Sequence, residues 1–422
     1  MKGLVIYSLK RLKVRNTLVE HLFSFKKYSS CSLDYLNVKR EIPFWVNKKC
    51  YDFIILHYSF LADERFVHNI NPWKLKSKRV KEFDSIKIAI PQDEHQFSDR
   101  LFDLFSSAKI DIIYTLYNRD DDIKKVYLKS KTYNPIIKKV LTGYIDDNAI
   151  KFFKNSPNLN KRKIDFAYRA RSLMENHGRH ASYKVLILKK LKKYLDQKAF
   201  NNDIEYGDDD ISSLLKSTKL GKDWFKFLIS SKFILGSESG ASLLDVDGSI
   251  QKKVFEFKFK NPKASFNEIE KNCFKNIDFN VSYFMMGPKN FEAILSKTLQ
   301  ILIEGEYNNI LKPSKHYIEL KKDFSNIDEI IKITNDLNFC QKFVDDAKED
   351  ILKNKRLYYK NFVEDILMDI SNIKEKRKFD TKAKNSFLTK IILAVHNYSI
   401  RIIGEFKILV KLFLSKVGIL KK

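Results

Sequence analysis

Short apolar runs recur along the first third of the chain, and polar residues cluster just after each of them. The runs have the length of buried strands, and they lie at 4–7, 53–56, 86–90, 110–114 and from Val140. Several intervals between them carry the apolar spacing of helices, and Thr17 and Glu20 form a capping-box pattern before the first helix. Buried strands that alternate with helices predict a parallel sheet covered on both faces, so we expect an α/β domain over residues 1–155.

A second set of strand and helix patterns follows a polar segment. The segment 155–163, NSPNLNKRK, contains Pro157 and is typical of a linker. Beyond it, strand patterns lie at 164–168, 233–235, 298–303 and from Tyr317, and helical patterns lie at 181–195, 224–229, 326–337 and 339–367. We expect these elements to form a second α/β domain over residues 164–370, which the helical segment at 339–367 closes.

The last segment, 381–422, is a basic amphipathic tail. Its apolar residues recur every three or four positions, and its only acidic residue is Glu405. Two interpretations stay open: a last helix packed on the second domain, or a helix lying in the interface of an anionic membrane. Charged residues interrupt every stretch of the ~20 apolar residues that a spanning helix needs.

The net charge of the chain narrows the classes of possible partner but does not select one of them. There are 79 Lys and Arg against 52 Asp and Glu, a formal net charge of +27. Such a charge is compatible with nucleic acid, an anionic membrane surface or phosphorylated substrates. The four cysteines form no CxxC pair and no zinc-module spacing, so we expect no bound metal.

The most specific signal lies in the stretch 283–326. Pro288 suits the first position of a helix, and we expect Glu292 in the first turn of that helix. A carboxylate there can accept two sugar hydroxyls while free backbone N–H groups face a phosphate. The alternative is an ordinary acidic residue that the helix dipole favours.

Five segments carry a family resemblance: PKNFEA, QILIEGEYNNILKP, HYIELKKDFSN, YRARSL and LGSESGASLLDVDG. They resemble bacterial GT-B glycosyltransferases of surface-polysaccharide biosynthesis, over roughly residues 1–370. The resemblance implies two Rossmann-like domains facing across a cleft, the first for an acceptor and the second for a nucleotide-sugar donor, with Glu292 on the donor ribose and no essential metal or other cofactor. Retaining enzymes of this fold often carry a second glutamate eight residues earlier, where this chain has Phe284, so retention or inversion stays open.

Basic residues and a small-residue loop are candidates for binding the donor diphosphate. Arg169, Arg171 and Lys184 follow the first strand of the second domain and could hold the departing diphosphate, but a chain this basic places many cations after strands. The loop of Gly236, Glu238, Ser239 and Gly240 follows another strand. Such a loop can bring backbone N–H groups to a diphosphate, or it is a plain strand-to-helix turn.

Three residues at first-domain strand ends are candidates for catalysis. His57 could contact the donor sugar or act as a base, although a lone histidine is more often structural. Asp93 and Glu94 follow the next strand and are alternative bases.

The resemblance implies a glycosyltransferase that moves a sugar from a nucleotide-sugar to a saccharide or lipid-linked saccharide in cell-surface glycan synthesis. We expect a cytoplasmic protein, peripheral on the inner face of the membrane through its tail, with no nucleic acid as partner. The alternative class is a basic nucleic-acid-binding protein without enzymatic activity, which the charge and the aromatic content invite.

Overall fold

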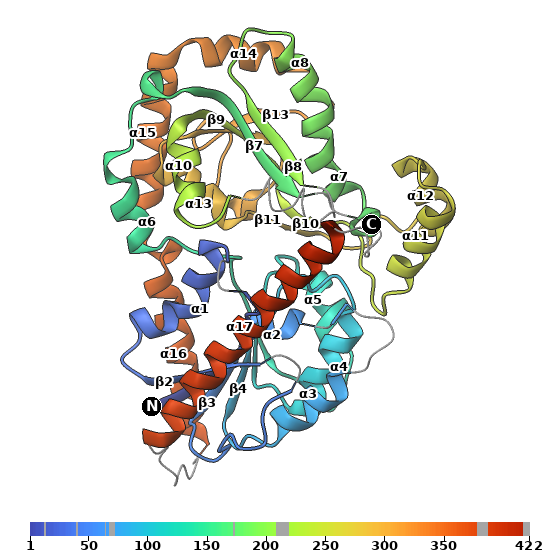
Figure 1. Ribbon diagram of the computed structural model, residues 1–422, viewed down its shortest axis with the longest axis vertical. Helices are drawn as coiled ribbons and strands as arrows, with labels where there is room; N and C mark the ends of the chain where they lie inside the picture. The colour runs from blue at the N-terminus through green and yellow to red at the C-terminus, as the bar shows by residue number, and fades with distance from the viewer. Residues whose placement is uncertain are drawn as a thin grey trace.

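The computed structural model describes residues 1–11, 14–38, 41–63, 65–66, 72–171, 174–207, 219–377 and 387–416. It contains two α/β domains, one below and one above in Figure 1, and each is built on a parallel sheet. The predicted α/β class with two Rossmann-like domains is confirmed.

The sheet of the first domain has six parallel strands in the order β2-β1-β3-β4-β5-β6. Their bounds are β1 (Lys2–Tyr7), β2 (Ser32–Asn37), β3 (Phe53–Leu56), β4 (Ile86–Ala89), β5 (Ile112–Thr115) and β6 (Ile136–Lys139). The four inner strands lie where the apolar runs predicted them. The edge strand β2 was not predicted, and β6 ends just before the run at Val140, because edge strands bury fewer positions and have a weaker apolar pattern.

Helices cover both faces of this sheet, as expected for parallel strands. They include α1 (Asn16–Tyr28), α2 (Tyr58–Ala62), α3 (Pro72–Lys81), α4 (Ser98–Ala108) and α5 (Asp120–Tyr127). The predicted capping box of α1 is absent: the N-cap residue is Arg15, and its side chain makes no capping hydrogen bond. Glu20 is therefore free for another role.

The sheet of the second domain has five parallel strands in the order β13-β12-β9-β7-β8. Their bounds are β7 (Ile164–Arg171), β8 (Asp203–Gly207), β9 (Ser231–Gly236), β12 (Leu299–Ile303) and β13 (Ile318–Leu320). The surrounding helices include α7 (Arg179–Leu186), α8 (Lys193–Asp196), α10 (Lys222–Ser230), α13 (Pro288–Leu295), α14 (Ile327–Asn335) and α15 (Leu337–Lys353). Only the edge strand β8 was not predicted.

A long excursion between β9 and α13 joins the two domains. It contains β10 (Ser239–Ala241), α11 (Ser249–Lys260), α12 (Phe266–Cys273) and β11 (Tyr283–Met285), and β10 pairs antiparallel with β11. Leu244, Val281 and Tyr283 pack in the core of the first domain. The phenol of Tyr283 lies 3.5 Å from a carboxylate oxygen of Glu94, which fixes one side of the domain boundary.

The chain crosses between the domains at two points that touch. Ile145 donates its N–H to Leu357 O at 2.7 Å, and Tyr359 donates its N–H to Ile145 O at 3.1 Å. This crossing lies ahead of the predicted linker at 155–163, whose Leu159 is instead buried in the core of the second domain. The prediction of a linker was wrong because the buried Leu159 is surrounded by polar residues in the sequence.

The return crossing leads into α16 (Tyr359–Lys376), which packs on the sheet of the first domain. Phe362, Val363 and Ile366 share a core cluster with strands β1, β3, β4 and β5. The predicted helical segment at 339–367 thus closes the second domain only through α15, and its remainder belongs to the first.

The predicted basic amphipathic helix of the tail is present as α17 (Phe387–Lys416). It lies against the edge strand β2 of the first domain and runs obliquely across the front of that domain in Figure 1. The alternative that the tail helix packs on the second domain is therefore wrong. None of the helices in the described ranges combines the length and the apolar character needed to cross a bilayer.

Candidate functional site

The start of α13 fixes Glu292 at the domain boundary. Pro288 occupies the first helical turn as predicted, and Asn290 locks it by accepting from Gly287 N at 2.9 Å and donating to Gln300 Oε1 at 2.8 Å. Glu292 is the fifth residue of this helix, so it lies past the first turn and away from the free N–H groups that the sequence analysis placed beside it.

The carboxyl group of Glu292 is buried and half satisfied. Trp224 Nε1 donates to its Oε2 at 2.7 Å, whereas Oε1 has no hydrogen-bond partner among the described residues. Burial, followed by the negative charge of Glu20, raises the pKa of Glu292 to about 8. The group can therefore gain hydrogen bonds from a ligand without losing one from the protein.

Three cations from both domains lie near one another, and one of them, Lys289, acts directly on this carboxyl group. Burial, together with the neighbouring charges of Lys289 and Arg15, lowers the pKa of Lys184 to about 7. Burial also lowers the pKa of Lys289 to about 8, again with a contribution from Arg15. Within the described ranges, none of the three side chains forms an ion pair or a hydrogen bond. Such a group of unpaired cations is suited to a multiply charged anion.

Asp93 acts on one of these cations, Lys184, from the first domain. It follows β4 in a left-handed conformation, with φ of 53°, and its side chain is exposed. Its backbone oxygen accepts from Arg65 Nη2 at 2.8 Å, and its charge raises the pKa of Lys184. We call the six residues at this boundary the boundary cluster: Arg15, Glu20, Asp93, Lys184, Lys289 and Glu292.

His57 is also at a first-domain strand end, but its ring is enclosed. Its Nε2 lies 3.1 Å from His21 Nδ1, and its Nδ1 lies 2.8 Å from Ser59 Oγ. The side chain is fully buried, and burial lowers its pKa well below the usual range. As placed, it caps α2 with both ring nitrogens occupied, so its geometry does not suit a base.

Glu94 is buried in a network of first-domain hydroxyl groups. Its carboxylate accepts from Thr115 Oγ1 at 2.6 Å, from Leu116 N at 2.8 Å and from the phenol of Tyr127. Burial raises its pKa to about 7. With its oxygens occupied by the protein, Glu94 supports the loop that carries Asp93.

Arg169, one of the two predicted arginines, does not join the boundary cluster. Arg169 pairs with Asp203 at 2.5 Å, and its guanidinium lies 4.6 Å from the ring centroid of Phe227. Its side chain is 7% exposed, so the charge is already neutralised inside the second domain. The side chain of Arg171 lies outside the described residues.

Contacts within the protein occupy much of the loop from Gly236 to Gly240. The Glu238 carboxylate is buried and accepts from Tyr307 N at 2.7 Å, and burial raises its pKa. Gly240 has φ of 108°, and a Cβ there would lie 1.7 Å from Tyr283 O, so the close β10–β11 pairing requires glycine. Ser239 and Gly240 remain half-buried at the surface.

Several residues of the site were not identified from the sequence. Arg15, Lys289 and Trp224 lie in ordinary basic or helical patterns, and Glu20 was assigned to a cap. Lys289 had a usable signal, because it follows the helix-starting Pro288 directly. Among the described residues, no group of His, Cys, Asp or Glu side chains has a metal-binding arrangement.

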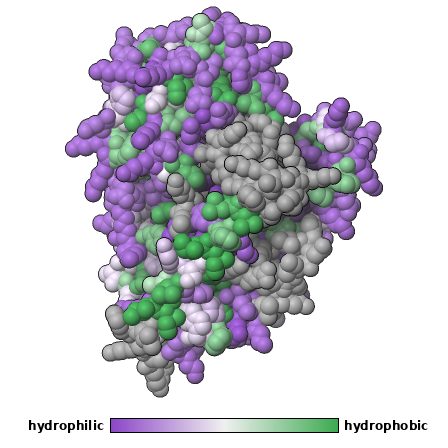
Figure 2. Space-filling view, in the orientation of Figure 1, coloured by the Kyte–Doolittle hydropathy of each residue, from purple (hydrophilic) through white to green (hydrophobic). Residues whose placement is uncertain are grey.

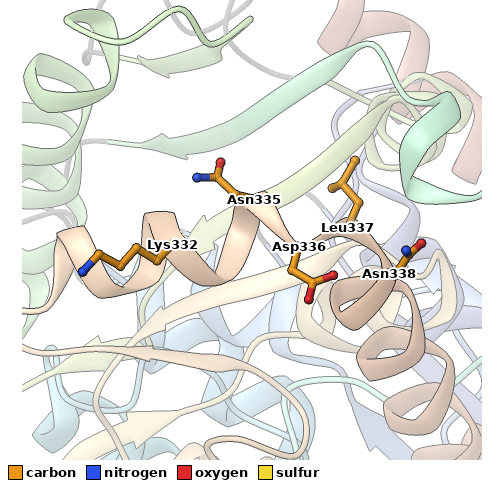
Figure 3. A pocket seen from close by; sticks show the side chains of 5 residues that line it. All are labelled: Lys332, Asn335, Asp336, Leu337 and Asn338. Carbon is orange, nitrogen blue, oxygen red and sulfur yellow. The ribbon is translucent and has the colours of Figure 1, made fainter.

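A separate hollow lies far from these residues in the sequence, where α14 meets α15 (Figure 3). It is open and has a volume of about 590 Å³. Its lining residues are Lys332, Asn335, Asp336, Leu337 and Asn338. Asp336 is already used there, because it accepts from Phe339 N at 2.9 Å and caps α15. The boundary cluster is the better candidate site.

Comparisons with known proteins identify the fold. No protein-family model matches the sequence, and no curated protein matches it. An alpha-glucosyltransferase in complex with UDP and a 13-mer DNA containing a central A:G mismatch matches with a TM-score of 0.50, at 8% identity over 88% of this chain and 99% of that chain.

Two further matches are Alr3699/HepE from Anabaena and TarM. The first, in complex with UDP and glucose, has a TM-score of 0.47 and 9% identity over 88% of this chain and 100% of that chain. TarM has a TM-score of 0.42 and 11% identity over 76% of this chain and 54% of that chain. The fold of the present chain is GT-B, as the sequence resemblance predicted.

Proposed function

We propose that this protein is a glycosyltransferase that moves a sugar from a nucleotide-sugar donor to a hydroxyl group of an acceptor. One observation carries the proposal: cations from both domains meet beside a buried carboxyl group, and the described residues provide no ion pair for these cations and no partner for one carboxyl oxygen. A nucleotide-sugar offers the complementary groups, a diphosphate for the cations and ribose hydroxyls for the carboxyl group.

The donor is held mainly by the second domain. Glu292 Oε1 accepts a ribose hydroxyl, while Trp224 keeps Oε2 in place. Lys184 and Lys289 bind the diphosphate, and Arg15 reaches it from the first domain. Their lowered pKa values rise when the anion arrives, because its charge stabilises their protonated forms. Fixed positive charge then stabilises the nucleoside diphosphate as it leaves.

Asp93 is the proposed base of the reaction. It accepts the proton of the acceptor hydroxyl as that oxygen bonds to the anomeric carbon. The bond from the anomeric carbon to the phosphate oxygen breaks, and the electron pair leaves with the nucleoside diphosphate. Asp93 suits this role better than His57 or Glu94, because its side chain is exposed and theirs are buried.

The acceptor we propose is a saccharide or lipid-linked saccharide of cell-surface glycan synthesis, and the protein acts at the cytoplasmic face of the membrane. The support is the resemblance of the segments around Glu292 to surface-polysaccharide enzymes. No essential metal or other cofactor is proposed, since Lys184, Lys289 and Arg15 supply the positive charge that the leaving group needs.

The test is a thermal-shift screen of the full chain against UDP, GDP, ADP and CMP, each with its common sugars, followed by donor hydrolysis. UDP is the first ligand to test, because the alpha-glucosyltransferase of matching fold was solved with UDP. A ligand that binds only the folded state raises the melting temperature by mass action. If no nucleotide or nucleotide-sugar raises it, the proposal fails.

A nucleic-acid partner is the second candidate. The net charge of +27 favours it, and the same alpha-glucosyltransferase was solved with DNA. Oligonucleotide binding that weakens steeply with salt, without any nucleotide-sugar hydrolysis, would support a binding protein instead. Sugar transfer to an oligonucleotide would instead support a glycosyltransferase whose acceptor is a nucleic acid.

A further inference from the structure

The helix α17 is attached to the first domain by one face. Asn397 Oδ1 accepts from Asn37 N at 2.7 Å, and Asn397 Nδ2 donates to Tyr35 O at 2.7 Å, so the side chain extends the edge of β2. His396 Nε2 lies 3.0 Å from Asn37 O, and Leu393 is buried in the first-domain core.

The same face of α17 packs on the loop that leads to Arg15. Arg401 Nε donates to Arg11 O at 3.2 Å. A Cβ on Gly404 would lie 1.7 Å from Lys10 O, so only glycine allows this contact. The helix is thus held over about three turns, from Leu393 to Gly404, and its later part contacts Lys10 and Arg11.

The opposite face of α17 is apolar and exposed. At 100° per residue, its residues lie about half a turn around the helix from Leu393 and Asn397. Val395, Phe406 and Leu409 are 61%, 66% and 62% exposed. We call this face the apolar stripe, and it consists of Ile391, Val395, Tyr398, Ile402, Phe406 and Leu409. Figure 2 shows the hydrophobic colour following the line of α17 across the first domain.

The charged residues in the sequence of α17 are mostly basic. Lys390 and Lys407 are exposed. The sequence of α17 also contains Arg401, Lys411 and Lys416, against the single acid Glu405. Six large apolar side chains facing solvent are an interaction surface, and this charge selects an anionic occupant.

We propose that the apolar stripe inserts into the interfacial region of an anionic lipid bilayer while the opposite face of α17 stays docked on the first domain. The proposal deepens the proposed function, because it names the surface at which a lipid-linked acceptor would meet the first domain. A second copy of this chain fits less well, since two chains of charge +27 repel each other whereas anionic head groups attract both.

This arrangement differs from a loose tail anchor. Because β2, Lys10 and Arg11 hold the helix, membrane binding positions the whole first domain and the loop of Arg15. The apolar stripe lies in the interface plane and does not cross the bilayer.

The experiment is flotation of the full chain with vesicles of phosphatidylglycerol and phosphatidylcholine, compared with vesicles of phosphatidylcholine alone. The variant Val395→Ser, Ile402→Ser, Phe406→Ser removes three exposed groups of the apolar stripe, so its folding is preserved. We expect at least ten-fold stronger binding of wild type to the anionic vesicles, and at least a ten-fold loss in the variant.

The matched control is Phe255→Ser, Phe259→Ser, Phe279→Ser, which removes three exposed phenylalanines of the excursion around α11 and α12. It should float as wild type does. Equal flotation of wild type and the stripe variant overturns the proposal. The proposal is also overturned if wild type does not float. This holds even if light scattering shows a wild-type dimer that only the stripe variant disrupts.

A nucleotide thermal shift on the stripe variant separates this proposal from the proposed function. If the variant keeps the wild-type shift but loses vesicle binding, both proposals stand. If wild type shifts with nucleotide but does not bind vesicles, only the membrane proposal fails.

Discussion

Trp224 donates its indole N–H to Glu292 Oε2 at 2.7 Å, across the contact between α10 and α13. The bond orients a carboxyl group that lies in the core-facing part of α13 and leaves Oε1 available. A buried group with one satisfied and one open oxygen is uncommon in a packed protein, because an open buried acceptor costs free energy. Ligand binding is the physical reason we assign to it.

Replacing Glu292 tests the ribose contact. In Glu292→Gln, an amide NH2 replaces one carboxyl oxygen and leaves a buried polar group at the ribose without its partner, so nucleotide-sugar affinity should fall by about 1–3 kcal/mol. Isothermal titration of the nucleotide found in the thermal-shift screen measures this. Trp224→Phe should weaken the same affinity, and Trp45→Phe, on the first domain, should leave it unchanged. Unaltered affinity in Glu292→Gln removes this residue from the site.

The raised pKa of Glu292 predicts a pH-dependent stability. The folded protein keeps the Glu292 proton up to pH about 8, whereas the unfolded chain releases it near the ordinary glutamate pKa of 4.5. Between these values the folded state binds more protons, so the free energy of unfolding falls as pH rises. Urea denaturation at pH 5 and pH 8 should show this fall, and it should be smaller in Glu292→Gln. Equal changes in both proteins would contradict the assignment.

The two lysines are expected to recognise the diphosphate and not the nucleoside. Lys184→Ala and Lys289→Ala should each weaken nucleoside diphosphate binding by about 1.5–3 kcal/mol, while binding of the matching nucleoside stays as in wild type. Lys189→Ala is the control, since Lys189 is exposed just beyond α7. Equal losses for the nucleoside and the diphosphate would point to a general disturbance of the site.

Asp93 and Glu94 are neighbours with different expected effects. Asp93→Asn should lower turnover at least about 100-fold with little change in donor affinity, because a base acts on the acceptor. Glu94→Gln should lower the free energy of unfolding by about 1–3 kcal/mol, since it disturbs a buried network. Steady-state kinetics and denaturation separate the two. Wild-type turnover in Asp93→Asn would place the base elsewhere.

Arg169 is expected to act on stability. Arg169→Ala leaves Asp203 without its partner and removes the contact with Phe227, so the free energy of unfolding should fall by about 1–3 kcal/mol. Donor affinity of the folded variant should stay as in wild type. Lys192→Ala breaks an exposed pair with Asp196 and should cost less than about 1 kcal/mol. A large loss of donor affinity in Arg169→Ala would restore its predicted diphosphate role.

The sequence predicted what local patterns determine. Inner strands such as β3 are continuous apolar runs, and Pro288 marks a helix start whatever surrounds it. The local sequence does not determine which charged side chains pair with one another. Both Arg169 and Lys184 were predicted to follow one strand, but Arg169 lies within β7 and Lys184 lies in α7. The pairing of β7 with β8 places Asp203 beside Arg169. Arg15 and Glu20 gain their roles only when the second domain folds over them.

The two crossings also determine the order in which the molecule can be completed during synthesis. Residues 145–353, the second domain, leave the ribosome as one continuous segment. The first domain must wait for α16 to cover its sheet and for α17 to occupy the edge of β2. An apolar sheet face and an open strand edge therefore stay exposed until α16 and α17 have been made, and exposed surfaces of this kind favour aggregation while a chain emerges.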